Sequence, residues 1–276
     1  IKVSLQKQNL LQRPIHIISA NMHSVLNTLY APEVLKTKLK GKNKLAIFEE
    51  LSANNRYREM VQKVALKEGM TYIKDESGTN IDVQIFDTAK YQSGAYAAQL
   101  SHLSHAEMPV IIVMDYAFGE QAYETMDELL KPYKPNPNTA HYLNVVSISI
   151  MGKAGILTGD KGDIMIPNAH IFEGTADNYP FENGLQKEDL EGHEVGVYEG
   201  AMISVLGTSL QNKDLLRYFN RSTWGVVGLE MEGAHYQKAI QAHAKIRKSI
   251  REDVMVNYAY YASDNPIKTG STLASG

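Results

Sequence analysis

Three short polar stretches, each placed after an apolar run, contain residue types that could carry chemistry. Gly152-Lys153-Ala154-Gly155 contains two glycines, which allow a ligand to approach the backbone closely. Glu230-Met231-Glu232 offers carboxylates that could accept hydrogen bonds from two ribose hydroxyls and stabilise positive charge on a sugar. Ser263-Asp264 ends a β-rich run, where burial could raise the pKa of the carboxyl so that it acts as an acid.

Each stretch also has a purely structural explanation. The glycines could form an ordinary tight turn, and the two carboxylates could stabilise the start of a helix through its dipole. Ser263-Asp264-Asn265-Pro266 consists of residues that favour turns. No single stretch therefore distinguishes chemistry from structure.

Short runs rich in Val, Ile and Tyr alternate with helix-like stretches, which is typical of βα units. We therefore predict an α/β fold, a single three-layer domain with a central mixed sheet flanked by helices. Because ligands of such sheets bind beyond the carboxyl ends of strands, polar residues there are the first candidates for a site. The expected strands are Ile15–Ile18, Ile81–Phe86, Val110–Met114, Val145–Ile150, Asp163–Pro167, Glu199–Val205, Val226–Leu229 and Asp253–Tyr261.

Apolar and charged residues alternate at helical spacing in four further stretches, and glycine, proline and asparagine mark two loops. Helices are expected at Lys44–Glu68, Gly119–Lys131, Lys213–Phe219 and Glu232–Lys248, and loops at Pro132–Asn138 and Gly174–Gly184. No linker separates two segments of different amino-acid composition, so we expect one domain over residues 1–276. Residues 1–14 would be an N-terminal extension, and truncation could have shortened the C-terminal end.

Composition limits the class of protein and partner. A net charge of −3 and a pI near 6.3 provide no basic field for nucleic acid, which favours a small-molecule partner. The absence of cysteine excludes disulfides and thiolate metal sites, and a cytoplasmic location is expected. No apolar run approaches the roughly 20 residues of a membrane-spanning helix. We expect no metal, no cofactor and no membrane partner.

Taken in order, the three stretches resemble the nucleoside phosphorylase and nucleosidase family, which includes purine nucleoside phosphorylase, methylthioadenosine nucleosidase and AMP nucleosidase. The resemblance covers Val110–Gly276. Gly152–Gly155, with Gly162-Asp163 after it, looks like the family's Gly-Ser-Ala-Gly and Gly-Asp segment. Glu230–Glu232 looks like its Glu-Met-Glu, and Ser263-Asp264 looks like its catalytic Ser-Asp, closest to the AMP nucleosidase version.

The resemblance implies cleavage of the N-glycosidic bond of a purine nucleoside or nucleotide. Asp264 would protonate the purine ring so that the base leaves neutral, and Ser263 would orient Asp264. Glu232 would bind the ribose hydroxyls, Met231 would pack on the sugar, and Glu230 would help to fix the base or the sugar.

Two other segments bear on the substrate. Gly200–Thr208 resembles the strand and loop that line the family's base pocket, with Thr208 as a candidate contact. Lys153 could meet the phosphate of a nucleotide, or free phosphate, or point into solvent. In Met114–Tyr123, only Gly119 resembles the family's glycine-rich turn, and Glu120 could activate water or cap a helix.

The sequence departs from the phosphorylases at the position where they bind phosphate. Ile150 stands where hexameric phosphorylases have an arginine, and Ser19–His23 lacks their glycine- and arginine-bearing loop. Water is therefore the expected nucleophile, with phosphorolysis as the alternative. A non-catalytic nucleotide-binding module on the same fold is a third hypothesis. The resemblance also implies a homo-oligomer.

Overall fold

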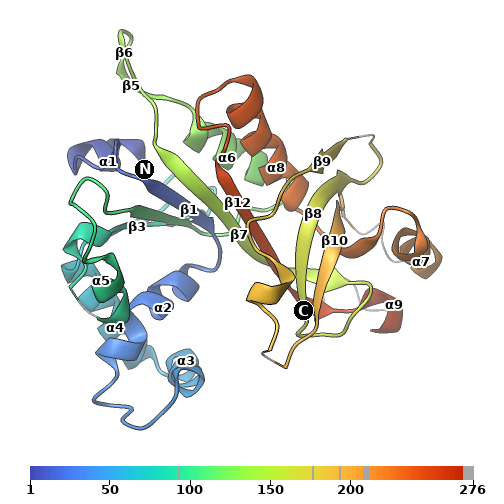
Figure 1. The fold of residues 1–276 in the computed structure, drawn as a ribbon, viewed down its shortest axis with the longest axis horizontal. Helices are drawn as coiled ribbons and strands as arrows, with labels where there is room; N and C mark the ends of the chain where they lie inside the picture. Colours follow the sequence, from blue (N-terminus) through green and yellow to red (C-terminus); the bar gives the residue numbers. More distant parts are fainter. Residues whose placement is uncertain (93, 176, 193, 208–211, 270–276) are drawn as a thin grey trace. The chain divides into compact units, whose positions relative to one another are not determined.

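The computed structural model describes residues 1–92, 94–175, 177–192, 194–207 and 212–269. The chain divides into two compact units (Figure 1). Unit 1 contains residues 1–115 and 144–146, and unit 2 contains residues 116–143 and 147–276. The predicted single domain over residues 1–276 stays a prediction.

Unit 1 is built on a mixed sheet in the order β1-β4-β3-β2. β1 runs parallel to β4, whereas β3 runs antiparallel to both of its neighbours. All five residues of β3 are buried, including the polar Gln84 and the charged Asp87. The strands are β1 (Ile15–Ser19), β2 (Met70–Ile73), β3 (Val83–Asp87) and β4 (Val110–Met114).

Helices cover this sheet and form an apolar cluster with it, in which α2 packs against α4. Val61 and Ala65, four residues apart on one face of α4, are fully buried there. The side chain of Asn54 accepts hydrogen bonds from the backbone N–H groups of Arg56 and Tyr57, so it caps α4. The helices are α1 (Lys2–Lys7), α2 (Met22–Val34), α3 (Lys44–Ala53), α4 (Asn55–Lys67) and α5 (Gly94–Leu100).

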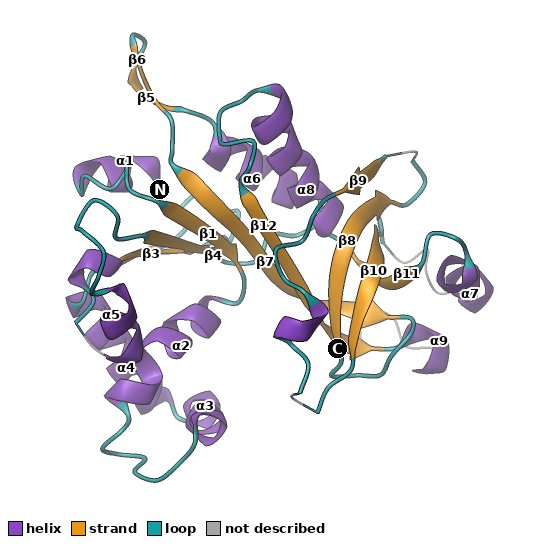
Figure 2. Cartoon of the chain, viewed as in Figure 1, coloured by secondary structure: helices purple, strands orange, loops and turns teal. Residues whose placement is uncertain are grey.

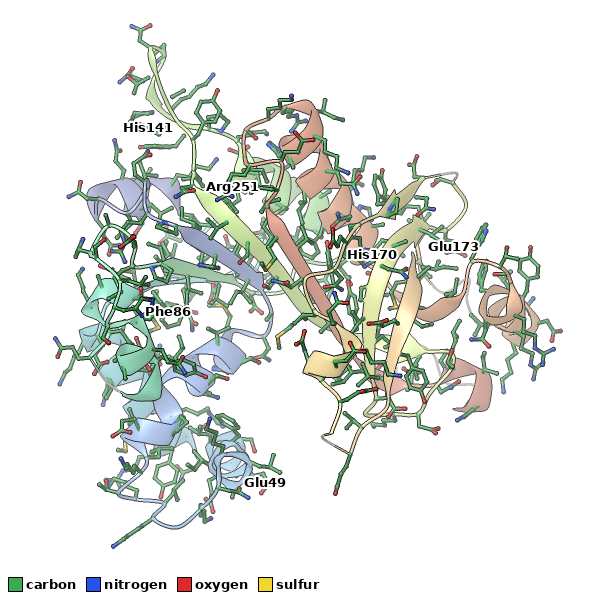
Figure 3. All side chains as sticks on the ribbon, in the orientation of Figure 1. Glu49, Phe86, His141, His170, Glu173 and Arg251 are labelled. Atoms are coloured by element: carbon green, nitrogen blue, oxygen red, sulfur yellow. The ribbon has the colours of Figure 1, made fainter. Side chains whose placement is uncertain are left out.

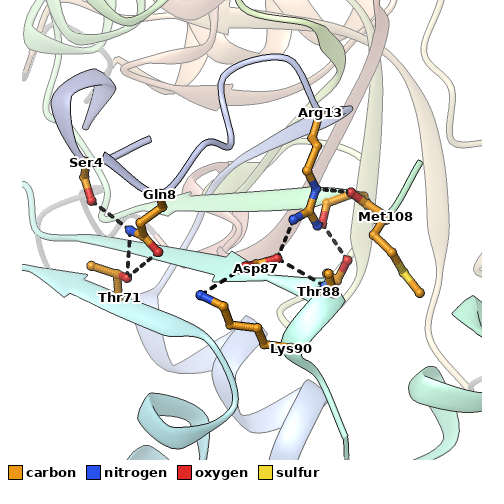
Figure 4. A network of polar contacts seen from close by, with 10 residues as sticks. Ser4, Gln8, Arg13, Thr71, Asp87, Thr88, Lys90 and Met108 are labelled. Carbon is orange, nitrogen blue, oxygen red and sulfur yellow. Dashed lines mark hydrogen bonds and ion pairs between the residues drawn. The ribbon is translucent and has the colours of Figure 1, made fainter. Parts of the chain in front are cut away.

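Residues 1–14, expected as an extension, are anchored in unit 1. Leu5 and Leu10 are fully buried, and Nη1 of Arg13 lies 2.6 Å from Oδ1 of Asp87. Nε of Arg13 also donates to the carbonyl of Met108, so one guanidinium ties together three segments (Figure 4).

Unit 2 contains five strands that close on themselves. The pairing runs β7-β12-β8-β10-β11 and returns to β7, with β12 parallel to β7 and β11 antiparallel to it. β8 and β10 lie side by side in parallel (Figure 2). The strands are β7 (Val145–Ile156), which enters unit 2 at Ser147, β8 (Ile164–Phe172), β10 (Val197–Ser204), β11 (Val226–Glu230) and β12 (Met255–Asp264).

The principal helix of unit 2 is α8, which packs against α6, β8 and β10. At its C-terminal end it passes into a π-helical turn at Ala242–Ile246. Three short strands complete the unit: β5 and β6 form a hairpin, and β9 pairs with β8. The bounds are α6 (Gln121–Leu130), α7 (Lys213–Arg221), α8 (Gly233–Gln241), α9 (Pro266–Thr269), β5 (Tyr133–Asn136), β6 (Thr139–His141) and β9 (Asn178–Pro180).

The predicted fold class, an α/β fold with a central mixed sheet flanked by helices, is confirmed, and all eight predicted strands are present. Three details are wrong. Asn54 divides the expected helix at residues 44–68, the expected loop at residues 132–138 contains β5, and the loop at residues 174–184 contains β9. Among the described residues, no helix is both long and apolar enough to cross a membrane.

The alternative explanation of Gly152–Gly155 as an ordinary tight turn is also wrong, because this stretch belongs to the continuous strand β7. Residues of β12 pair with it as far as Gly155, and β11 pairs with Gly155 and Ile156 from the other side. Tertiary pairing on both edges supplies the backbone with partners and overrides the tendency of glycine to form turns.

Candidate functional site

The sequence-predicted residues converge on Gly155 of β7. Gly155 is the register partner of Asp264, the last residue of β12, and also of Leu229 in β11. Because adjacent strands lie about 4.8 Å apart, the ends of β11 and β12 lie about 10 Å apart across β7. The segments Glu230–Glu232 and Ser263-Asp264 are therefore brought to the same part of unit 2.

Ser263 and Asp264 occupy a bulge at the end of β12. Ala262 pairs with Ala154 and Asp264 with Gly155, so Ser263 is the extra residue between them. Its hydroxyl lies 2.8 Å from Oδ1 of Asp264 and 3.2 Å from the carbonyl oxygen of Ala154, and it can donate to either one. Asp264 is half-buried, so its carboxylate lies at the boundary between the interior and solvent.

Glu230 is buried and fully engaged by the protein. The hydroxyl of Ser204 donates to Oε1, and the backbone N–H groups of Glu232 and Gly233 donate to Oε2. The latter two groups open α8, so Glu230 caps that helix from the preceding strand. Burial raises the pKa of Glu230 to about 7, although the hydrogen bonds from Ser204 and Gly233 lower it in part.

Glu232 is oriented by the backbone of the segment before α6. The N–H group of Gly119 donates to its Oε1 at 3.1 Å, and Gly119 has a φ of +52°, a left-handed conformation that favours glycine. Burial raises the pKa of Glu232, and the N–H group of Gly119 partly lowers it. Met231, between the two glutamates, is 37% exposed and presents apolar surface.

Four tyrosines surround these carboxylates. Burial, followed by the charges of Glu232 and Glu230, raises the pKa of Tyr116 well above its ordinary value. The same causes act on Tyr260, and burial and Glu230 act on Tyr258. The fourth, Tyr236, accepts a hydrogen bond from the N–H group of Ala117 and also contributes to the raised pKa of Tyr116. The sequence prediction did not include these tyrosines.

A buried histidine adjoins this cluster. The hydroxyl of Tyr260 lies 3.3 Å from Nε2 of His170, which lies on β8 (Figure 3). Burial lowers the pKa of His170 to about 3, so its ring is neutral near pH 7. The two glutamates therefore lie among aromatic side chains, and His170 contributes no positive charge near pH 7.

Gly152 and Lys153, predicted together, occupy opposite faces of β7 because successive strand residues alternate. Gly152 shares its face with the fully buried Ile150, and a Cβ atom on Gly152 would lie 1.7 Å from the hydroxyl oxygen of Tyr116. Lys153 is exposed on the other face, together with Met151. Their predicted roles in substrate binding stay predictions.

The remaining candidates are less informative. Thr208 lies outside the described residues. Glu120 is exposed and stands at the N-cap position of α6, where its side chain makes no capping hydrogen bond. Within the described ranges, no group of three or more His, Asp and Glu side chains is placed to hold a metal ion.

Two clefts in the described residues lie elsewhere. One, of about 530 Å³, lies in unit 1 between α2 and α3, and another, of about 500 Å³, lies in unit 2 at the start of β12. The candidate site at Gly155 is thus identified by its carboxylates and their partners, and not by the size of a cavity.

Comparison with solved structures identifies relatives of the fold. Futalosine hydrolase of Helicobacter pylori matches with a TM-score of 0.51 and 12% identity, over 94% of this chain and 91% of that chain. The 5'-methylthioadenosine/S-adenosylhomocysteine nucleosidase of Helicobacter pylori, solved with butyl-thio-DADMe-Immucillin-A, matches with a TM-score of 0.50 and 12% identity, over 94% and 89%. No curated protein sequence matches.

At 12% identity these matches establish the fold alone. The predicted resemblance to the nucleoside phosphorylase and nucleosidase family is confirmed at that level. A family model described as a family of unknown function (DUF6909) matches residues 44–276, which is most of the chain and includes every candidate site residue. The chain therefore belongs to the DUF6909 family.

Proposed function

We propose that this protein hydrolyses the N-glycosidic bond of a purine nucleoside or nucleotide. The observation that carries the proposal is the register at Gly155, which brings the Ser263-Asp264 pair and the Glu230–Glu232 segment together on a nucleosidase-like fold. Asp264 and Glu232 are the two carboxylates that could act on opposite sides of the bond.

The reaction requires an acid at the base and negative charge near the sugar. A proton held by Asp264 moves to a ring nitrogen of the purine as the bond between the base and the anomeric carbon breaks, and the bonding electrons leave with the base. Water adds to the anomeric carbon and loses a proton to solvent. Glu232 accepts hydrogen bonds from the ribose hydroxyls, and its charge stabilises the cationic ribosyl group in the transition state.

Glu230 has a positioning role in this proposal. Both of its carboxylate oxygens already accept hydrogen bonds from Ser204, Glu232 and Gly233, so it fixes the turn that carries Glu232. Met231 and the strongly exposed Phe118, which adjoins Gly119, supply apolar surface for the sugar or the base.

Water is preferred to phosphate as the nucleophile. A multiply charged anion needs cationic or clustered polar donors, but the position of the phosphorylase arginine is Ile150, which is fully buried in β7. The neighbouring Gly152 makes room for the ring of Tyr116. In a nucleotide substrate, Lys153, which is exposed on β7, would meet the phosphate.

Incubation with a panel of purine nucleosides and nucleotides, with and without inorganic phosphate, tests the proposal. Release of a free base and a free sugar that does not need phosphate is the expected result. Release that requires phosphate and yields a sugar 1-phosphate would instead establish the phosphorylase alternative.

A non-catalytic nucleotide-binding module is the second candidate. The observation that favours it is the close approach of Tyr116 to Gly152, because a glycine that could admit a ligand to the backbone serves internal packing here. This candidate predicts that purine ligands raise the melting temperature while no base is released. We also propose a homo-oligomer, specificity for purines and a cytoplasmic location. Size-exclusion chromatography with light scattering tests the first of these.

A further inference from the structure

A cleft of about 500 Å³ lies in unit 2, at the end of β12 opposite to Asp264. The first and last residues of this ten-residue strand are about 30 Å apart along its length, so the cleft is separate from the candidate nucleosidase site. Its walls come from the segment around Phe181, from α8 and the π-helical turn, and from residues 252–256. A volume of this size suits a small organic molecule.

Gln237 of α8 is one of the residues that line this cleft. The residue is only 2% exposed, and its Oε1 has no hydrogen-bond partner among the described residues. A buried carbonyl oxygen without a donor costs free energy, and a ligand that donates an N–H group to it recovers that cost. The amide therefore favours a ligand with a hydrogen-bond donor.

The charged residues around the cleft carry a net negative charge. Glu182, Glu252 and Asp253 line it, against a single lysine, Lys245. Asp253 is paired with Arg251, whose Nη2 lies 2.6 Å from its Oδ2. Glu182 and Glu252 are the remaining acidic groups, so the rim favours a cation over an anion.

Between these polar groups the wall is apolar. Phe181, Ile240 and Met255 supply an aromatic ring and hydrocarbon surface. The ring of Phe181 is held by stacking on the buried His170, with ring centroids 5.3 Å apart, so this surface is preformed. Such a wall suits the hydrocarbon part of a ligand.

Two features fix the shape of the cleft. A Cβ atom on Gly184 would lie 2.3 Å from Oδ1 of Asn257 and 2.9 Å from Cγ of Met255, so this position needs glycine to lie so close to β12. On the opposite wall, the π-helical turn carries Lys245 and is anchored by His243, whose Nε2 lies 3.0 Å from Oδ1 of Asp127. π-Helical turns often occur at functional sites.

The geometry points to a second binding site, for a small organic cation in which an ammonium or guanidinium group is attached to a short hydrocarbon chain. An N–H group of the cation donates to Oε1 of Gln237, its charge faces Glu182 and Glu252, and its hydrocarbon chain lies along Phe181, Ile240 and Met255. This site does not depend on the proposed nucleosidase activity.

Calorimetric titration of the full chain with agmatine and with n-pentylamine, at low and at physiological salt, tests this inference. The expected result is saturable binding of both amines that weakens as salt rises, with no binding of 1-pentanol, which has the same chain length but no charge. Glu252→Gln should weaken binding at least threefold and reduce its salt dependence, while the exposed Glu124→Gln on α6 should leave binding unchanged.

Gln237→Met, which replaces the amide with a side chain of similar length, separates the polar contact from general charge attraction. It should weaken the binding of n-pentylamine at least tenfold. Equal binding of n-pentylamine and 1-pentanol, or unchanged binding by both Gln237→Met and Glu252→Gln, would overturn the inference. Because Glu252 is exposed, its variant is expected to fold even if the core substitution does not.

Discussion

The hydroxyl of Ser263 lies within hydrogen-bonding distance, 2.8 Å, of Oδ1 of Asp264, and Ser263 is itself the bulged residue at the end of β12. The bulge leaves Ser263 without a register partner in β7, although its hydroxyl also reaches the carbonyl oxygen of Ala154. A donor that can turn between a carboxylate and a carbonyl can follow a change in the charge of the carboxylate. In the proposed mechanism, the pair supports proton transfer from Asp264.

Asp264→Asn should reduce base release by about 100- to 10,000-fold, because an amide cannot supply the proton that the leaving purine needs. The variant keeps the size and polarity of the side chain, so purine ligands should still raise its melting temperature. A base-release assay and a thermal shift measured on the same preparation check both expectations.

The matched control is Asp214→Asn, an exposed acid on α7 that lies outside the candidate site. It should retain full activity. Base release by Asp264→Asn at the rate of the unaltered protein would remove Asp264 from the mechanism.

Ser263→Ala should lower kcat by about tenfold with little change in KM, because Ser263 acts through Asp264 and does not touch the substrate. Ser263→Thr keeps the hydroxyl and should restore kcat. An unchanged kcat in Ser263→Ala would indicate that the serine has only a packing role.

Glu230 should make the stability of the protein depend on pH. Burial raises its pKa from 4.5 to about 7, so the folded state binds this proton more tightly than the unfolded state. The contribution of Glu230 to the free energy of unfolding is then greatest below about pH 4.5 and falls as pH rises to about 7. The total change is about 3 kcal/mol.

Two substitutions separate this charge from the capping role of Glu230. Glu230→Gln resembles the protonated acid, with an oxygen for the N–H groups of Glu232 and Gly233, so this part of the pH dependence should disappear. Glu230→Ala leaves those donors without a partner and should lower stability by about 1–3 kcal/mol across the whole range. Urea unfolding at several pH values measures both effects, and an unchanged slope in Glu230→Gln would contradict the assignment.

The elements of the fold that local patterns specify could be predicted from the sequence. β4 is a continuous apolar run, as a buried strand requires, and its bounds were predicted without error. β2 was missed because it is only four residues long and buries only Met70 fully. α2 was missed because Pro32 interrupts its helical pattern, and β5 because Pro135 suggested a loop.

The contacts that orient the candidate site could not be predicted in the same way. The hydrogen bond from Gly119 to Glu232 joins positions 113 residues apart, and Ser204 reaches Glu230 from another strand. No local pattern encodes such pairs, because they depend on how strands assemble. The resemblance of three short motifs supplied the residues, and the register at Gly155 accounts for their proximity.

Gly152→Ala should destabilise the protein by about 1–3 kcal/mol, because the added methyl group would lie 1.7 Å from the hydroxyl oxygen and 2.6 Å from Cζ of Tyr116. The ring of Tyr116 must then move, and its hydroxyl is buried near Glu232 and Glu230. If the ring of Tyr116 is the reason that position 152 needs glycine, Gly152→Ala should change the free energy of unfolding little in a Tyr116→Ala background. Urea unfolding of the two single variants and the double variant should then give a coupling energy of about 1–3 kcal/mol. Gly152→Ala as stable as the unaltered protein would show that Tyr116 does not need this space. The same cycle measured by base release distinguishes packing from ligand binding. If Gly152 also contacts the substrate, the double variant should be as stable as Tyr116→Ala but should release base more slowly.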